Sequence, residues 1–474
     1  MALKFGTAGV RAFMGEGEER LNEQTVSRLA WAAARVLAQI HGEGRRVTVA
    51  YDTRQNSLAF AQVTAAAFAK QGFEVFIFSQ PAPTPLLSFT IRQLGCVGGV
   101  NITASHNPKE YNGFKLYGPQ GAQVGEDVSR PVAEKWAGGK SSTQEDFWNA
   151  LSEGRIHWVG AEIWQGYFRA VLALRRRREN VKTRVLYSPL FGTGQSVVPT
   201  LFRQAGIDLR GVKSQLWGDG SFPGLEVPNP EEPDAFIQLL NEADDEHLLL
   251  ATDPDADRLG AVWNGEENYE WLSGNQIGLL LLDYLLRFEK DPSSCLVVKS
   301  VVSTPLADRI CLEHGVSCIN TLTGFRHVTE AVDRLADKRL LLAFEESGGF
   351  LAGDYCREKD AAAAALLLAE AADYHLRRSY TLPMALEELY RTYGFAWDDT
   401  TVLRVNMEGD AYVQHLRDHA PAVFRGYPID RREDYAQRCD PLRSNMLAYY
   451  SGRTRLLIRP SGTEPAVKIY KSIM

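Results

Sequence analysis

Three apolar, strand-like segments of this sequence each run directly into a short loop of chemically useful residues. They are the segments 100–102 before Ser105, 248–250 before Asp253 and 340–342 before Glu345. Helix-like segments alternate with such strands along most of the chain, which predicts α/β domains with largely parallel sheets. In open α/β folds, ligands bind beyond the carboxyl ends of the strands. The pattern therefore predicts a threefold structural repeat with functional side chains at the strand ends.

The alternation is clearest in the first third, where strands are predicted over 46–51 and 73–79 and helices over 26–40, 58–71 and 85–94. It returns over 184–252, with a helix predicted at 233–243, and over 275–372, with an alanine-rich helix predicted at 360–376. The last part breaks this rhythm, because 400–407 and 454–458 alternate as strands do. We therefore predict a small α+β domain at the C-terminal end.

Composition fits an ordinary globular protein of more than one domain. The 474 residues are 45% hydrophobic and 23% charged, and the formal net charge of −7 argues against a general nucleic-acid binder. No apolar run reaches membrane-spanning length, and the N-terminus shows no signal-peptide core. The six cysteines form no C-x-x-C pair, which fits reduced thiols and disfavours structural zinc. We expect a soluble cytoplasmic protein with no membrane or nucleic-acid partner.

A candidate nucleophile lies in the segment 103–108, Thr-Ala-Ser-His-Asn-Pro. Neighbouring side chains diverge on an extended backbone, so His106 is poorly placed to act as the base for Ser105. The G-x-S-x-G turn of hydrolases is also absent. Ser105 therefore needs activation from elsewhere in the chain.

A candidate metal site follows the strand at 247–251. Asp253, Asp255 and Asp257 alternate along an extended loop, so their carboxylates share one side. Such hard oxygen donors suit Mg²⁺. A calcium EF-hand is rejected, because Arg258 and Asn264 stand where that loop needs Gly and Glu. A solvated acidic turn is the alternative.

Two further loops point to a phosphorylated sugar. Arg459, two hydroxyl residues and flexible backbone in 459–465 could cradle a phosphate, although a plain turn explains the same residues. The acidic and hydroxyl residues of 345–349 suit sugar hydroxyls, although a capping turn is equally good. Lys115 and Lys359 are basic candidates, although an isolated lysine is usually solvated. Together, a serine nucleophile, a Mg²⁺ site, a sugar loop and a phosphate cradle predict phosphoryl transfer on a sugar phosphate.

In this order, the motifs resemble those of the α-D-phosphohexomutase superfamily, and the match runs from Phe5 to Ile469. Segments 103–108, 253–258, 345–349 and 459–463 look like its phosphoserine, metal, sugar and phosphate loops. Segments 5–11, 108–113 and 357–360 are most similar to the phosphoglucomutase and phosphopentomutase branch.

The resemblance implies four domains around a central cleft: three related α/β units with mixed sheets, and a small C-terminal α+β domain. The expected bounds are 1–140 with the phosphoserine loop, 141–265 with the metal loop, 266–385 with the sugar loop and 386–474 with the phosphate loop. Ala12 stands where many members have glycine. The chain also ends at Met474, where relatives usually continue through another helix, so we expect a leaner fourth domain.

The resemblance further implies that Ser105 is carried as phosphoserine and binds Mg²⁺ together with Asp253, Asp255 and Asp257. Arg11, His106 and Lys115 would line the reacting centre, with Lys115 or Lys359 assisting proton transfer. The residues implied to bind substrate are Glu345, Ser347, Arg459, Ser461, Gly462, Thr463, Arg258, Thr323 and Gly324.

The expected activity is Mg²⁺-dependent interconversion of glucose 1-phosphate and glucose 6-phosphate. Glucose 1,6-bisphosphate would serve as bound intermediate and activator, and the protein would be a monomer or homodimer. A phosphomannomutase or a phosphopentomutase is the nearest alternative. A sugar-phosphate phosphatase or a catalytically silent sugar-phosphate sensor would belong to other classes.

Overall fold

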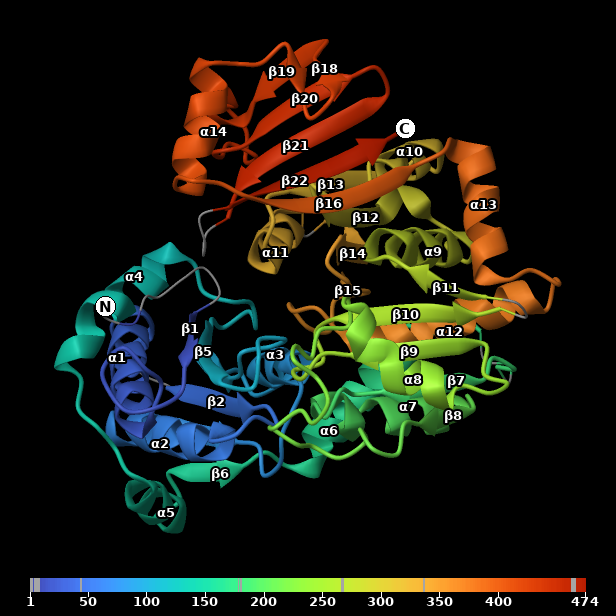
Figure 1. Cartoon of the computed structure of the whole chain (residues 1–474). Helices are drawn as coiled ribbons and strands as arrows, with labels where there is room; N and C mark the ends of the chain where they lie inside the picture. The colour runs from blue at the N-terminus through green and yellow to red at the C-terminus, as the bar shows by residue number, and fades with distance from the viewer. Residues whose placement is uncertain are drawn as a thin grey trace. The chain divides into compact units, whose positions relative to one another are not determined.

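The structure, a computed structural model, describes residues 3, 9–42, 45–177, 179, 181–265, 268–335, 337–461 and 466–474. The chain forms two compact units (Figure 1). The first comprises Met1–Gly274 with Ser347–Ser379, and the second comprises Asn275–Glu346 with Tyr380–Met474. No helix among the described ranges is long and apolar enough to cross a membrane.

The first unit opens with a six-stranded mixed sheet. Its strand order is β1 (Val10–Phe13), β5 (Tyr111–Tyr117), β4 (Gly98–Ile102), β2 (Arg46–Tyr51), β3 (Glu74–Ile77) and β6 (Ile156–Trp158). The last four are parallel, whereas β1 pairs antiparallel with β5, and β5 with β4. The helices are α1 (Glu23–His41), α2 (Ser57–Lys70), α3 (Thr84–Gln93), α4 (Glu126–Lys135), η1 (Trp136–Gly138) and α5 (Gln144–Ser152). Helices α1, α2 and α5 pack into one core on one face of this sheet, and α3 covers the other (Figure 1).

A second mixed sheet completes the first unit. Its strand order is β11 (Tyr269–Leu272), β10 (Leu259–Asn264), β9 (Leu248–Thr252), β7 (Val185–Ser188) and β8 (Leu209–Gly211). The shorter elements of this part of the first unit are α6 (Ala161–Leu172), η2 (Thr193–Ser196), α7 (Val198–Ala205), η3 (Pro233–Phe236) and α8 (Ile237–Glu242). Strand β15 (Gly349–Leu351) also belongs to the first unit but is not a strand of this sheet.

The alanine-rich helix α12 (Ala361–Leu376) packs against β9, β10 and α7 of this sheet (Figure 1). Its small side chains allow close approach on every side, and nearly all of the helix is buried. Two buried carboxylates hold its second half, since Glu370 pairs with Arg175 at 3.1 Å and Asp373 with Arg177 at 3.0 Å. These contacts hold α12 in place beside the second sheet.

The second unit joins a parallel sheet to an antiparallel one. Strands β13 (Ser317–Thr321), β12 (Cys295–Ser300) and β14 (Arg339–Glu345) are parallel and are accompanied by α9 (Gly274–Arg287), η4 (Pro292–Ser294), α10 (Leu306–Glu313), α11 (Phe325–Arg334) and α13 (Leu382–Tyr393). The antiparallel sheet has the order β16 (Trp397–Arg404), β22 (Ala466–Ile473), β21 (Thr454–Pro460), β20 (Leu447–Ser451) and β19 (Arg431–Asp434). Beside it are α14 (Gly409–Asp418), the hairpin β17 (Val423–Phe424) with β18 (Tyr427–Pro428), and η5 (Tyr435–Gln437).

The predicted fold class is confirmed. The orders β5-β4-β2-β3 and β10-β9-β7-β8 are the same arrangement, and β14-β12-β13 repeats its parallel part. Two predicted elements differ in detail. Residues 233–243 form η3 followed by α8 rather than one helix. The strand predicted at 400–407 is β16, which ends at Arg404 because that residue pairs with Ala466, the first residue of β22.

Candidate functional site

Ser105 lies just beyond the end of β4 and is almost fully buried, with 2% of its surface exposed. Its backbone is not extended, as the sequence reasoning assumed, but left-handed, with φ of 51°. The N–H of Ser105 donates to Thr103 Oγ1 at 2.8 Å. A non-glycine residue in this conformation is strained, and such strain is often found at functional sites.

Arg54, which the sequence analysis missed, holds the Ser105 loop in this shape. Its guanidinium donates to the backbone carbonyls of Ser105 (2.5 Å), Pro108 (2.8 Å) and Tyr111 (3.0 Å), and also to the carbonyl of residue 107. It pairs with Asp52 at 3.2 Å, and both side chains are fully buried. Burial lowers the pKa of Arg54, and the negative charge of Asp52 opposes this shift. This pair directly follows strand β2, as Ser105 follows β4, but that position alone does not show which backbone carbonyls Arg54 binds.

We expect Arg54→Met to destabilise the fold strongly, because it leaves the buried carboxyl of Asp52 without its cation. Breaking a buried pair in this way costs about 3–5 kcal/mol of unfolding free energy. The matched control is Arg46→Met at the other end of the same strand, whose ion pair with Glu74 is exposed and should be worth less than about 1 kcal/mol. Urea unfolding of both variants measures the difference. If both variants lost the same free energy of unfolding, Arg54 would not stabilise the Ser105 loop.

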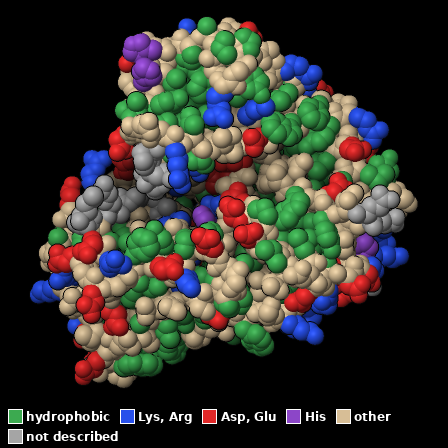
Figure 2. Space-filling view, viewed as in Figure 1, with side chains coloured by type: hydrophobic (Ala, Val, Ile, Leu, Met, Phe, Trp, Pro, Cys, Tyr) green, Lys and Arg blue, Asp and Glu red, His purple; other side chains and the backbone are tan. Residues whose placement is uncertain are grey.

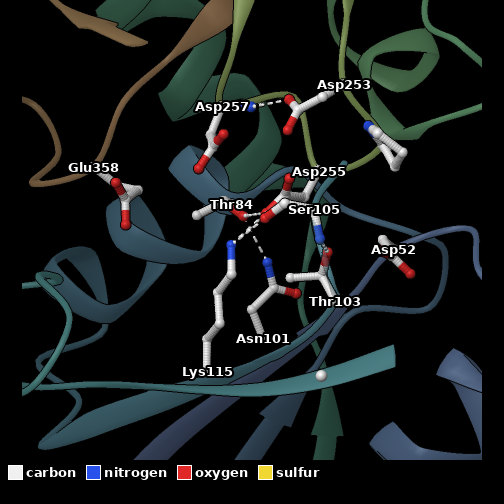
Figure 3. Close-up of polar contacts among 12 residues, drawn as sticks. Asp52, Thr84, Asn101, Thr103, Ser105, Lys115, Asp253, Asp255, Asp257 and Glu358 are labelled. Atoms are coloured by element: carbon white, nitrogen blue, oxygen red, sulfur yellow. Dashed lines mark hydrogen bonds and ion pairs between the residues drawn. The ribbon is translucent and has the colours of Figure 1, made fainter. Parts of the chain in front are cut away.

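Ser105 Oγ lies at the centre of a buried polar cluster (Figure 3). Lys115 Nζ donates to Oγ at 2.7 Å and to Asp255 Oδ2 at 2.7 Å, and Oγ itself donates to Asp255 Oδ2 at 3.1 Å. Arg11 Nη2 approaches Oγ to 3.3 Å. Lys115 is only 1% exposed. The alternative that it is an ordinary solvated lysine is therefore wrong. The serine oxygen thus has a proton donor and a carboxylate as direct neighbours.

His106 does not pair with Ser105 in this arrangement. Burial lowers the pKa of its imidazole well below the usual range, and the positive charges of Arg258 and Arg11 lower it further. Its Nδ1 has no hydrogen-bond partner within the described part of the chain.

The three aspartates converge as expected, but on a tight turn rather than on an extended loop. One oxygen from each of Asp253, Asp255 and Asp257 lies within 4.8 Å of the others, and Ala256 between them has φ of 53°. Asp253 Oδ1 closes the turn by accepting the N–H groups of Asp257 at 3.0 Å and Arg258 at 2.9 Å.

Each aspartate leaves one oxygen unused. Asp253 Oδ2, Asp255 Oδ1 and Asp257 Oδ1 are buried and have no hydrogen-bond partner among the residues that the structure describes. Burial raises the pKa of Asp253 well above its usual range, and the charges of Asp257 and Asp255 add to this effect. Buried carboxylate oxygens that face one another without donors are the ligand set that a hard divalent cation needs. The residues therefore fit Mg²⁺.

Lys359 is the second lysine at this cluster. Its Nζ lies 3.1 Å from Asp257 Oδ2 and 3.1 Å from Glu358 Oε1. Glu358 is 1% exposed and also accepts a hydrogen bond from Gln123 at 3.0 Å. Glu358 directly precedes Lys359, but no sequence pattern had pointed to it.

Two implied substrate residues lie close by on the same unit. Arg258 pairs with Glu231 at 2.7 Å. Ser347 precedes Gly348, whose carbonyl accepts the N–H of Leu259 at 2.9 Å. Gly348 has φ of 73°, and a Cβ there would stand 2.8 Å from the Leu259 carbonyl. Ser347 is thereby held next to the end of the metal loop.

The other implied substrate residues belong to the second unit. Glu345 ends β14, and its Oε1 accepts the N–H of Gly324, the residue after Thr323, at 2.8 Å. Arg459 lies near the end of β21, and the N–H of Ser461 donates to the Ala466 carbonyl at 2.9 Å, which closes the loop between β21 and β22. Gly462 and Thr463 lie outside the described residues.

Family models match this chain over most of its length. They are described as phosphoglucomutase/phosphomannomutase alpha/beta/alpha domain I at residues 2–142, domain II at 165–266 and domain III at 273–393. A phosphoglucomutase of Staphylococcus haemolyticus (strain JCSC1435) is 33% identical over 99% of this chain and 90% of its own length. One of Staphylococcus aureus (strain MRSA252) is 32% identical over 99% and 89%.

Solved structures share the fold. A putative phosphomannomutase from Thermus thermophilus aligns with a TM-score of 0.78 at 24% identity, over 100% of this chain and 95% of that one. The open form of the Paramecium phosphoprotein pp63/parafusin aligns with a TM-score of 0.74 at 16% identity, over 99% and 90%.

Proposed function

This chain belongs to the phosphoglucomutase/phosphomannomutase family, and we propose that it interconverts glucose 1-phosphate and glucose 6-phosphate through a phosphoserine at Ser105. The family membership makes it an intramolecular phosphotransferase of this type. The observation that carries the proposal is the position of Ser105 Oγ, which lies 2.7 Å from Lys115 Nζ and next to three converging aspartates. Figure 2 shows basic and acidic side chains of the described residues interspersed on the visible face.

In the proposed cycle, the phosphoryl group on Ser105 passes to the free hydroxyl of a bound sugar phosphate. The bond between phosphorus and Oγ breaks as a bond from phosphorus to the sugar oxygen forms. Lys115 Nζ donates a proton to the departing Oγ. Lys359, entering this step as the neutral amine, accepts the proton of the sugar hydroxyl. The bisphosphate then turns in the site and the steps run in reverse, so that an isomer is released and no inorganic phosphate.

Charge is the main demand of this chemistry, because the transferring group is anionic throughout. We propose that Asp253, Asp255 and Asp257 hold Mg²⁺ together with Ser105. Mg²⁺ would neutralise charge on the transferring phosphoryl group. Arg11 Nη2, 3.3 Å from Ser105 Oγ, is placed to bind phosphoryl oxygens.

The decisive experiment is product analysis with purified protein, Mg²⁺ and a trace of glucose 1,6-bisphosphate as the proposed activator. Glucose 1-phosphate should give glucose 6-phosphate without inorganic phosphate. Stoichiometric release of inorganic phosphate would instead identify a phosphatase. Mannose 1-phosphate and ribose 1-phosphate in the same assay separate the three mutase activities by kcat/KM.

Glu345 is our candidate for hydrogen bonding to sugar hydroxyls. Our other candidates for substrate binding are Ser347, Thr323, Gly324, Arg258, Arg459, Ser461, Gly462 and Thr463. We expect Glu345→Ala to lower kcat/KM for glucose 1-phosphate about 10- to 100-fold, the effect of losing about 1.5–3 kcal/mol of hydrogen bonding to a charged group. Phosphorylation of Ser105 by the bisphosphate should change less. The control is Glu330→Ala, an exposed carboxylate on α11, which should keep the parent rate. A similar loss in both variants would contradict the role.

A further inference from the structure

Thr84, the first residue of α3, holds the metal loop at two points. Its backbone N–H donates to the backbone carbonyl of Asp255 at 3.0 Å. Its hydroxyl Oγ1 lies 2.8 Å from Asp255 Oδ2. Both residues are completely buried, so no water competes for these bonds. One residue of the first sheet region thus fixes both the main chain and the side chain of an aspartate that belongs to the second.

Asn101, on β4, determines which way the Thr84 hydroxyl points. Its amide Nδ2 donates to Thr84 Oγ1 at 2.7 Å (Figure 3). A threonine hydroxyl has a single hydrogen. Because the oxygen already accepts from Asn101, that hydrogen is directed to the other neighbour, Asp255 Oδ2. Asn101 is also completely buried, so the chain from Asn101 through Thr84 to Asp255 has one orientation.

This chain of hydrogen bonds separates the two oxygens of Asp255. Among the described residues, Thr84, Ser105 and Lys115 all donate to Oδ2. Oδ1 has no partner within the described residues and is the oxygen left free for a cation. A rotation of this carboxylate would exchange the two roles, and Thr84 opposes it.

We propose that Thr84, aligned by Asn101, is a positioning residue that orients Asp255 for divalent metal. This inference rests on the proposed metal site. Its importance grows in the proposed phosphoserine form, because a phosphorylated Oγ carries no hydrogen to give to Oδ2. Thr84 and Lys115 are then the two donors left on that oxygen. Hydrogen bonds of this kind behind a metal ligand typically change metal affinity 10- to 100-fold.

The test is Mg²⁺ affinity, measured by calorimetry and by the rise in melting temperature across a Mg²⁺ titration, in parent and variants of the full chain. Thr84→Val keeps the shape but removes the hydroxyl, and should weaken Mg²⁺ binding at least about tenfold. Thr84→Ser restores a hydroxyl and should recover most of the affinity. The matched control is Thr90→Val on the same helix, whose buried hydroxyl donates to the Leu86 carbonyl at 2.7 Å and should leave the affinity unchanged.

A second variant tests the relay. Asn101→Ala should also weaken Mg²⁺ binding, and in the Thr84→Val background it should add less than about twofold, because the two residues act on Asp255 as one unit. If the parent binds Mg²⁺ and the Thr84→Val variant binds it equally well, the proposed role of Thr84 is wrong. Full additivity would overturn the relay through Asn101. A parent chain that binds no Mg²⁺ would instead overturn the metal site itself, and this inference with it.

Discussion

Replacing Ser105 by alanine should reduce mutase activity at least about a thousandfold, the scale of losing a covalent nucleophile. The reason is geometric, because Ser105 Oγ lies 2.7 Å from Lys115 Nζ and 3.1 Å from Asp255 Oδ2. The neighbouring Thr84 hydroxyl cannot replace it, since that hydroxyl is committed to Asp255. Steady-state rates with glucose 1-phosphate, together with the failure to take up label from a labelled bisphosphate, measure the loss. Activity close to that of the parent would exclude the covalent route.

Ser105→Gly is the matched control, because it separates the chemistry from the fold. The left-handed backbone at this position, with φ of 51°, is strained for alanine but free for glycine, a difference of about 1 kcal/mol. We therefore expect the glycine variant to be as inactive as the alanine variant yet more stable in urea unfolding. If the glycine variant were the less stable of the two, the loop would adopt another conformation.

The fold and the order of the motifs could be predicted from the sequence because both are local signals. A buried strand followed by a polar loop is visible in the apolar runs before Ser105, Asp253 and Glu345, and the structure places each run on a strand, β4, β9 and β14. The burial of the lysines could not be predicted from the sequence, because it depends on distant residues. Nothing local distinguishes Lys115 from a solvated lysine, and its burial comes from the Asp255 loop, 140 residues away in the chain.

The residues that shape the site were missed for a related reason. Arg54 bonds to backbone carbonyls, which carry no sequence signature, and Thr84 and Asn101 look like ordinary residues of a helix start and a strand. The importance of Thr84 and Asn101 comes from the contact of Thr84 with Asp255, which joins residues that are 171 positions apart in the chain. The turn at Ala256, with φ of 53°, also replaced the extended loop that the alternating aspartates suggested.

The aspartate site leads to the second large effect. In Asp253→Asn, Oδ1 can still accept the N–H groups of Asp257 and Arg258 that close the turn. The free oxygen Oδ2 becomes an NH₂ group, which cannot bind a cation. We expect activity to fall at least about a hundredfold, and chelation of the parent followed by Mg²⁺ addition to abolish and restore turnover. The matched control is Asp245→Asn, which replaces an exposed carboxylate of the same region. It should leave both the activity and its dependence on Mg²⁺ unchanged.

Whether Asp253→Asn or the parent is the more stable protein should depend on Mg²⁺, which activity measurements alone cannot reveal. Without metal, three buried carboxylates repel one another, and this repulsion helps raise the pKa of Asp253. Asparagine at this position carries no charge and is free of that repulsion, so metal-free Asp253→Asn should be more stable than the metal-free parent. With Mg²⁺ at about a hundred times its dissociation constant, the parent should gain about 2.7 kcal/mol and become the more stable protein. Melting curves of both proteins with chelator and with Mg²⁺ should cross in this way, because the carboxylates are arranged for a cation and against one another. Parallel curves, with the parent more stable in both conditions, would mean that Asp253 supports the turn rather than a metal.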